Sequence, residues 1–119
     1  MNDNLISIFE PHYEFFGRQP ELSRIILREM LFYGSGQQAT RYRQNRVRLM
    51  NLISQPFRFG MKAGTVRQDV DADTLGWIAF AIFQVELRRW IAEPAQDLNE
   101  GIVRLRTELA IFESGFALR

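Results

Sequence analysis

Apolar side chains recur every three or four residues along most of the chain, the spacing that places them on one face of a helix. This pattern predicts helices over residues 4–16, 20–33, 38–63, 72–92 and 98–116. No segment alternates apolar and polar residues between turn signals, so we expect no strands. The 119 residues therefore predict an all-α protein, one domain of five helices around a single core.

Residues that stabilise helix ends stand at several of these boundaries. Asp71 precedes the fourth helix, and Asp97, with Glu100 three residues later, precedes the fifth. Both aspartates are expected to accept hydrogen bonds from the first backbone N–H groups of their helices. Gly17 and Gly64 follow the first and third helices, where glycine favours termination.

Two prolines fall inside the predicted helices. Proline removes a backbone donor and crowds the preceding turn. Pro11 therefore predicts a kink in the first helix, or a helix that begins near this residue. Pro56 predicts a kink near Leu52 in the third helix.

The segment 75–87 differs from the other helices because its apolar side chains point in every direction. An ordinary surface helix carries one apolar stripe. Here the helix must be covered on all sides, by its own domain, by a second chain or by lipid. The continuation to residue 91 includes Gln84, Glu86, Arg88 and Arg89, and a membrane span needs about 20 mainly apolar residues. We therefore expect no membrane span.

The composition narrows the class of protein. Hydrophobic residues make up 46% and charged residues 24% of the chain, as in globular proteins. The net charge of +1 gives no bulk electrostatic case for binding nucleic acid. The absence of cysteine excludes disulfides and thiolate metal sites. The first four residues lack the basic and apolar regions of a signal peptide, so we expect a cytoplasmic protein.

The residues offer little for catalysis. His12 is the only histidine, and a lone histidine is more often a hydrogen-bonded structural group than a metal ligand. The segment 34–36, Gly-Ser-Gly, is a short linker and does not match a phosphate-binding loop. We expect no enzyme activity, no cofactor and no metal.

One connector carries a resemblance to a known family. Residues 64–71 read Gly-Thr-Val-Arg-Gln-Asp-Val-Asp and run into an apolar helix. This pattern resembles the C-terminal domain of the tetracycline-repressor-type (TetR) transcriptional regulators, in which a similar connector precedes the penultimate helix. Residues 16–25, with a proline that opens a helix after a short loop, also look like the helix entry of that domain. The resemblance covers nearly the whole chain in the order and length of its helices.

The resemblance implies a longer protein with separate DNA-binding and effector-binding domains. Family members carry an N-terminal helix-turn-helix domain, which residues 1–119 do not contain, so the chain looks like the C-terminal domain alone. The other implied partners are a second copy of the chain, paired through its last two helices in a four-helix bundle, and a small apolar or amphipathic effector. DNA would be bound only through the missing N-terminal domain.

The apolar faces of the last two helices are the predicted dimer interface. The alternative is that these residues fill the core of a monomer. The predicted interface residues are Ile78, Ile82, Phe83, Leu98, Ile102, Leu105, Leu109, Phe112 and Phe116.

Aromatic and methionine side chains with a few polar groups among them suit a small-molecule cavity. The alternative is that they simply pack together, and polar members such as His12, Tyr13, Tyr33 and Gln84 are the candidates to orient a ligand. The predicted cavity residues are Phe9, His12, Tyr13, Phe16, Met30, Tyr33, Met50, Ile53, Phe57, Trp77, Phe80 and Gln84.

A basic run, Arg41, Arg43, Arg46 and Arg48, opens the third helix. Since these side chains spread over more than half of the helix circumference, a solvated face is favoured over an anion site. The predicted function is the effector-binding and dimerisation domain of a TetR-like regulator. The alternative function is a stand-alone helical adaptor that binds partner helices in an apolar groove and has no effector.

Overall fold

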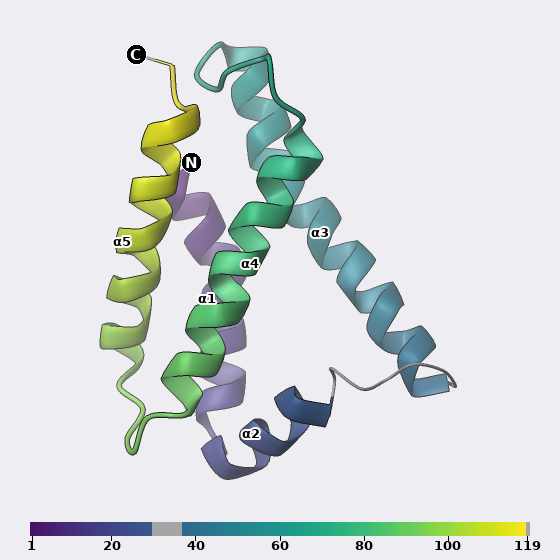
Figure 1. Ribbon diagram of the computed structural model, residues 1–119, viewed down its shortest axis with the longest axis vertical. Coiled ribbons are helices and arrows are strands. Elements are labelled where there is room, and N and C mark those ends of the chain that lie inside the picture. The colour runs from purple at the N-terminus through teal and green to yellow at the C-terminus, as the bar shows by residue number, and fades with distance from the viewer. Residues whose placement is uncertain (30–36, 119) are drawn as a thin grey trace.

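The computed structural model describes residues 1–29 and 37–118, and it is all-helical over these ranges (Figure 1). Residues 29, 37–39 and 42 are described by their backbone alone. The helices are α1 (Asn2–Gly17), α2 (Pro20–Glu29), α3 (Gln37–Ala63), α4 (Ala72–Ile91) and α5 (Leu98–Phe116). The prediction of five helices without strands is confirmed for the described part of the chain. No described helix is both long and apolar enough to cross a membrane.

Helix α4 lies at the centre of the arrangement and contacts each of the other four helices. Helices α1 and α5 run beside it, and α2 lies across one end (Figure 1). The C-terminal half of α3 packs against α4, and its N-terminal half diverges from the rest (Figure 1). The central position of α4 explains why the segment 75–87 is apolar on several faces.

Both predicted N-caps are present. The Asp71 carboxylate accepts a hydrogen bond from the Thr74 amide at 3.1 Å, and the Asp97 carboxylate accepts one from the Glu100 amide at 3.2 Å. Gly64 follows α3 with a φ of 79°, a left-handed conformation that glycine adopts at little cost. These three boundaries were correctly predicted.

Two predictions for α1 need correction. The helix begins at Asn2 and continues through Pro11, so a start near the proline was wrong. Gly17 is the last residue of the helix, and the C-cap is Arg18. The glycine serves packing, because a β-carbon on Gly17 would lie 2.7 Å from the indole of Trp90.

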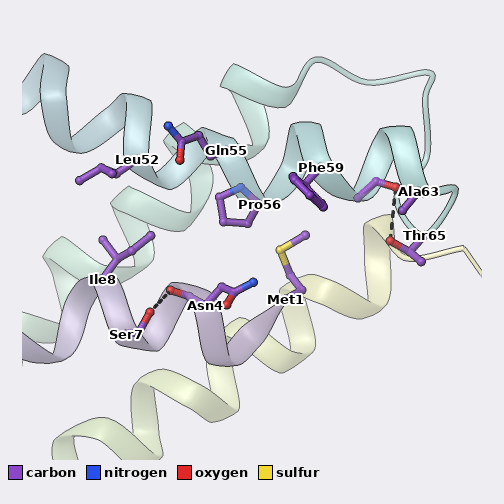
Figure 2. Close-up of a pocket in the computed structure, with 11 residues that line it drawn as sticks. Met1, Asn4, Ser7, Ile8, Leu52, Gln55, Pro56, Phe59, Ala63 and Thr65 are labelled. Atoms are coloured by element: carbon purple, nitrogen blue, oxygen red, sulfur yellow. Dashed lines mark hydrogen bonds between the residues drawn. The ribbon is translucent and has the colours of Figure 1, made fainter.

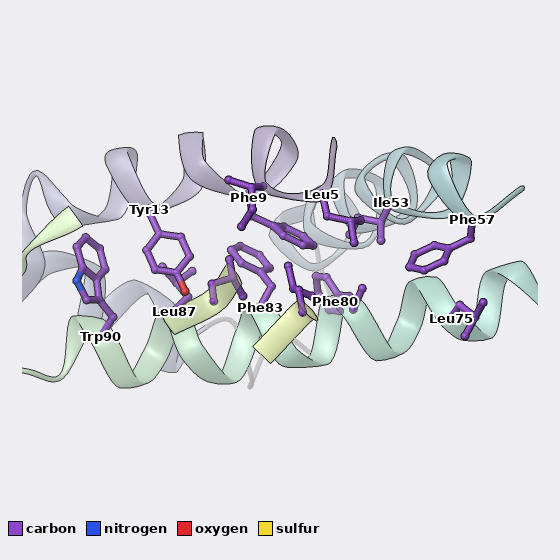
Figure 3. Packing of buried hydrophobic residues seen from close by; sticks show 14 of the residues in the cluster. Leu5, Phe9, Tyr13, Ile53, Phe57, Leu75, Phe80, Phe83, Leu87 and Trp90 are labelled. Carbon is purple, nitrogen blue, oxygen red and sulfur yellow. The ribbon is translucent and has the colours of Figure 1, made fainter. Parts of the chain in front are cut away.

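The core follows the seam between α1 and α4 (Figure 3). The rings of Phe9 and Phe83 stack with centroids 4.4 Å apart, and Tyr13 packs on Trp90 at 5.0 Å. Phe57 closes the far end against Phe116. Stacked and tilted aromatic pairs of this kind add stability beyond the apolar area that they bury.

The connector between α3 and α4 is tied to the C-terminal end of the chain. The Arg67 amide donates to the Phe116 carbonyl, and the Leu118 amide donates to the Thr65 carbonyl, both at 2.9 Å. Val66 between them is buried. The connector that carries the family resemblance therefore holds the end of α5 against the α3–α4 turn.

A charged cluster joins α4 to α5. The buried Glu86 lies 3.2 Å from Arg89 and 3.7 Å from the Nε of Arg104, whose NH1 pairs with Glu93 at 2.5 Å. Burial and the neighbouring Glu86 carboxylate raise the pKa of the Tyr13 hydroxyl. This cluster connects the two helices around the Glu86 carboxylate, which is buried, whereas the side chain of Arg89 is exposed.

Candidate functional site

A cavity of about 210 Å³ lies where α1, α2, α3 and α4 meet, and it is more enclosed than the groove between α1 and α3. The side chains around it combine aromatic and aliphatic walls with four polar groups. The lining residues are His12, Phe16, Leu27, Asn45, Arg46, Leu49, Phe80, Phe83 and Gln84.

Helical spacing explains how four helices supply these groups. Residues three or four apart share a face, as His12 and Phe16 do on α1, and Phe80 and Gln84 on α4. The burial of the lining residues differs between the two ends of the cavity. Leu27 and Phe83 are buried, whereas Asn45 is exposed. The cavity thus has an apolar inner end and a polar mouth on α3.

His12 presents a hydrogen-bond acceptor at this site. Its Nδ1 lies 3.2 Å from the Ile8 carbonyl, which can only accept, so Nδ1 carries the proton of the neutral ring and Nε2 has the free lone pair. The ring meets Phe83 edge-on, with centroids 5.5 Å apart. Burial lowers the pKa of His12, which favours the neutral form at pH 7.

Gln84 and Arg46 present donors. The Gln84 side-chain carbonyl accepts a hydrogen bond from Arg88, which orients the amide and leaves its N–H groups without a partner among the described residues. The guanidinium of Arg46 lies over the Trp77 ring, 5.8 Å from its centroid, in a cation–π contact. Arg46 thus lines the cavity itself, whereas Arg88 holds the side chain of Gln84.

Four of the predicted ligand-binding residues line this cavity, namely His12, Phe16, Phe80 and Gln84. Four others fill the core instead, because the α1–α4 seam and the α3–α5 contact close over them: Phe9, Tyr13, Ile53 and Phe57. Met50 and Trp77 line another hollow between α3 and α4, which shares Arg46 with the cavity. Met30 and Tyr33 lie outside the residues whose side chains the structure describes.

The cavity also contains residues that were not assigned to it from the sequence. Leu49 belongs to an apolar face of α3 that the sequence does reveal. Leu27 instead shares the buried side of α2 with Ser23, whereas Leu22 and Ile25 are exposed. Arg46 stands in the basic run that was interpreted as a solvated face, yet it is half-buried against Trp77. Arg46 lies one helical turn before Leu49, and this spacing places the two side chains on the same face of α3.

A second, more open hollow of about 500 Å³ runs between α1 and α3 (Figure 2). Its hydroxyl groups are engaged locally: Ser7 donates to the Asn4 carbonyl and Thr65 donates to the Gly60 carbonyl. Phe59 at its edge is 78% exposed. Because it is more open to solvent than the cavity, this groove is the weaker candidate.

The predicted dimer residues divide by burial. Phe83, Leu105, Leu109 and Phe116 lie in the chain's own core, where they pack against α1 and α3 rather than facing outwards. The other five are Ile78, which is 41% exposed, and the half-buried Ile82, Leu98, Ile102 and Phe112. The dimer contact itself stays a prediction for a single chain.

The most exposed apolar residues of α4 and α5 are Val85, Val103 and Ile111, at 61–69%. They were not assigned to the interface, because a helix that is apolar on several sides has no polar face to fix its rotation.

No three histidine, aspartate or glutamate side chains in the described part of the chain converge on a metal position. Comparison of the chain with protein-family models, with curated proteins and with solved structures finds no match.

Proposed function

We propose that this chain is the effector-binding and dimerisation domain of a TetR-like transcriptional regulator. The observation that carries the proposal is the cavity between α1, α2, α3 and α4, whose lining combines apolar walls with a few polar groups. DNA binding would belong to an N-terminal domain outside residues 1–119.

Support for self-association comes from the exposed side chains of the last two helices. Helices α4 and α5 pack side by side (Figure 1). Ile78 and Val85, two turns apart on α4, and Val103 and Ile111, eight residues apart on α5, are exposed and apolar. A second copy of the chain would cover these faces in a twofold contact.

Helix α4 would couple the two sites. Phe80, Phe83 and Gln84 line the cavity, whereas Ile78 and Val85 face away from the core. A ligand that favours one position of α4 shifts the population of dimer arrangements by its differential affinity for them. A DNA-binding domain attached before α1 would then sense the shift.

Thermal melting against a panel of lipophilic small molecules tests the ligand part. A ligand that binds the folded state raises the melting temperature. We expect at least one hit, lost in Leu49→Trp, which fills the cavity, and kept in Leu52→Trp, which changes α3 at the groove instead. No hit across the panel would favour the helical adaptor.

Light scattering tests the dimer part. Replacing a predicted interface residue by arginine should break the dimer. Phe112→Arg would disturb the core as well, because Phe112 packs on Phe116 with ring centroids 4.9 Å apart. Ile111→Arg is the cleaner variant, since Ile111 is 69% exposed, and Phe59→Arg on α3 is its control. We expect a dimer for the wild type and Phe59→Arg and a monomer for Ile111→Arg. A monomeric wild type would overturn the dimer proposal.

A further inference from the structure

The imidazole of His12 brings one unused hydrogen-bond acceptor to the wall of the cavity. Its Nδ1 donates to the Ile8 carbonyl of its own helix at 3.2 Å, so the second nitrogen, Nε2, keeps a lone pair. Burial lowers the pKa of His12, and the ring is therefore neutral at pH 7.5. Nε2 is the ring nitrogen farther from the main chain, and it has no hydrogen-bond partner among the described residues. Because the ring lines the cavity, a bound molecule would meet this acceptor.

Two other side chains of the described lining hold carbonyl acceptors, and both differ from His12. The Gln84 carbonyl already accepts from Arg88. Asn45 is exposed, so water can satisfy its carbonyl. A ligand that displaces water from the cavity thus leaves the lone pair of His12 unpaired unless it donates a hydrogen bond, and an unpaired buried acceptor weakens binding.

Apolar walls define the rest of the ligand. The rings of Phe16, Phe80 and Phe83 line the cavity, and Phe83 is fully buried. Aromatic rings favour tilted and offset-stacked contacts with other rings. Since an apolar cavity of about 150 Å³ can bind benzene, the cavity of about 210 Å³ is large enough for one or two fused rings.

We propose that the cavity binds a phenol, whose hydroxyl donates to Nε2 of His12 and whose aromatic ring packs against Phe80 and Phe83. A phenolic hydroxyl is more acidic than an aliphatic one and is therefore the stronger donor. Its oxygen can still accept a hydrogen bond, either from water or from the N–H groups of Gln84. The inference rests on the proposed effector-binding function and specifies the class of effector.

Isothermal titration calorimetry at pH 7.5 with three probes tests the proposal. 2-Naphthol carries the hydroxyl, naphthalene lacks it, and 2-methoxynaphthalene keeps the oxygen but has no proton to donate. One comparator is smaller and the other larger than 2-naphthol, so a steady trend with size cannot favour 2-naphthol over both. We expect the wild type to bind 2-naphthol about tenfold more tightly than either comparator, the scale of one buried hydrogen bond.

Two variants then locate the effect. His12→Phe keeps a flat ring beside Phe83 and removes the acceptor. It should weaken 2-naphthol binding about tenfold and leave 2-methoxynaphthalene binding within threefold, which would show that the cavity survives the substitution. Asn45→Ala, the matched control at the exposed mouth, should keep the preference for 2-naphthol.

Nitrogen-15 NMR of the single histidine tests the same hydrogen bond in the wild type alone, so it does not depend on how a variant folds. We expect a protonated Nδ1 and an unprotonated Nε2 in the free protein. Saturation with 2-naphthol should move the Nε2 signal more than saturation with 2-methoxynaphthalene does. A proton on Nε2 in the free protein would overturn the proposal.

Equal binding of the three probes, or a preference for 2-naphthol that survives His12→Phe, would overturn the phenol proposal and leave the effector-binding function standing. Binding of none of the probes would also overturn it. In that case another hit from the lipophilic panel would preserve the function, and the absence of any hit would remove both.

Discussion

The indole of Trp90 packs so closely on Gly17 that a β-carbon on the glycine would come within 2.7 Å of the ring. The ring has little freedom to retreat. Its Nε1 donates to the Asp97 carbonyl at 2.9 Å, and a β-carbon on Gly101 would lie 2.9 Å from the same nitrogen. Trp90 of α4 is thus held between glycines of α1 and α5, at the junction of three helices.

Gly17→Ala is therefore expected to destabilise the fold. Overpacking costs about 1–3 kcal/mol, and the better helix propensity of alanine returns up to about 1 kcal/mol, so the net loss should be about 1–2 kcal/mol. Gly115→Ala is the matched control, because no atom lies within 4 Å of its added β-carbon. Urea unfolding should show a loss for the first variant and a small gain for the second. A gain for both would contradict the packing described around Trp90.

Glu108→Gln is expected to stabilise the protein at neutral pH. Partial burial and the nearby Glu86 carboxylate raise the pKa of Glu108 above its usual 4.5. Its protonated form is favoured in the folded state, so its contribution to stability is present below about pH 4.5 and lost as the pH rises through the raised pKa. The variant keeps the neutral form at all pH values.

Urea unfolding of the wild type and Glu108→Gln from pH 4.5 to 7.5 measures this effect. The two stabilities should be nearly equal at pH 4.5, and the difference in favour of the variant should grow as the pH rises to 7.5. Glu14→Gln, at an exposed position of α1, is the control. A difference that stays constant or shrinks as the pH rises would contradict a raised pKa of Glu108.

His12 should titrate below its usual pKa of 6.5, because burial disfavours the charged ring. The folded state then loses stability as the pH falls through the lowered pKa. Proton NMR gives a direct measurement, since the chain has one histidine and its ring signals need no assignment. A midpoint above 6.5 would show that the ring is solvated or paired with a carboxylate.

The sequence was sufficient to predict features that depend on neighbouring residues alone, such as helix caps. Asp71 and Asp97 cap helices because a carboxylate reaches the third following amide whatever surrounds it. The same holds for Gly64 at the end of α3. Helix number, order and boundaries could therefore be predicted within a few residues over the described ranges.

Side-chain assignments on α4 were less successful because they depend on the rotation of the helix. Phe83 was placed at the dimer interface, yet it stacks on Phe9 in the core and borders the cavity. Neighbouring positions on an all-apolar helix differ by about 100° and have no polar residue to mark the solvent side. Arg46 was not assigned to the cavity because its surroundings depend on Trp77 of another helix, which the sequence of α3 does not reveal.

The central claim is that a small molecule occupies the cavity beside His12. Proton NMR of the histidine ring during titration with any hit from the lipophilic panel tests it most directly, because the His12 ring lines the cavity. We predict saturable shifts of the His12 signals that disappear in Leu49→Trp. Ligands that bind without moving these signals, or a full panel that leaves them unchanged, would contradict the claim.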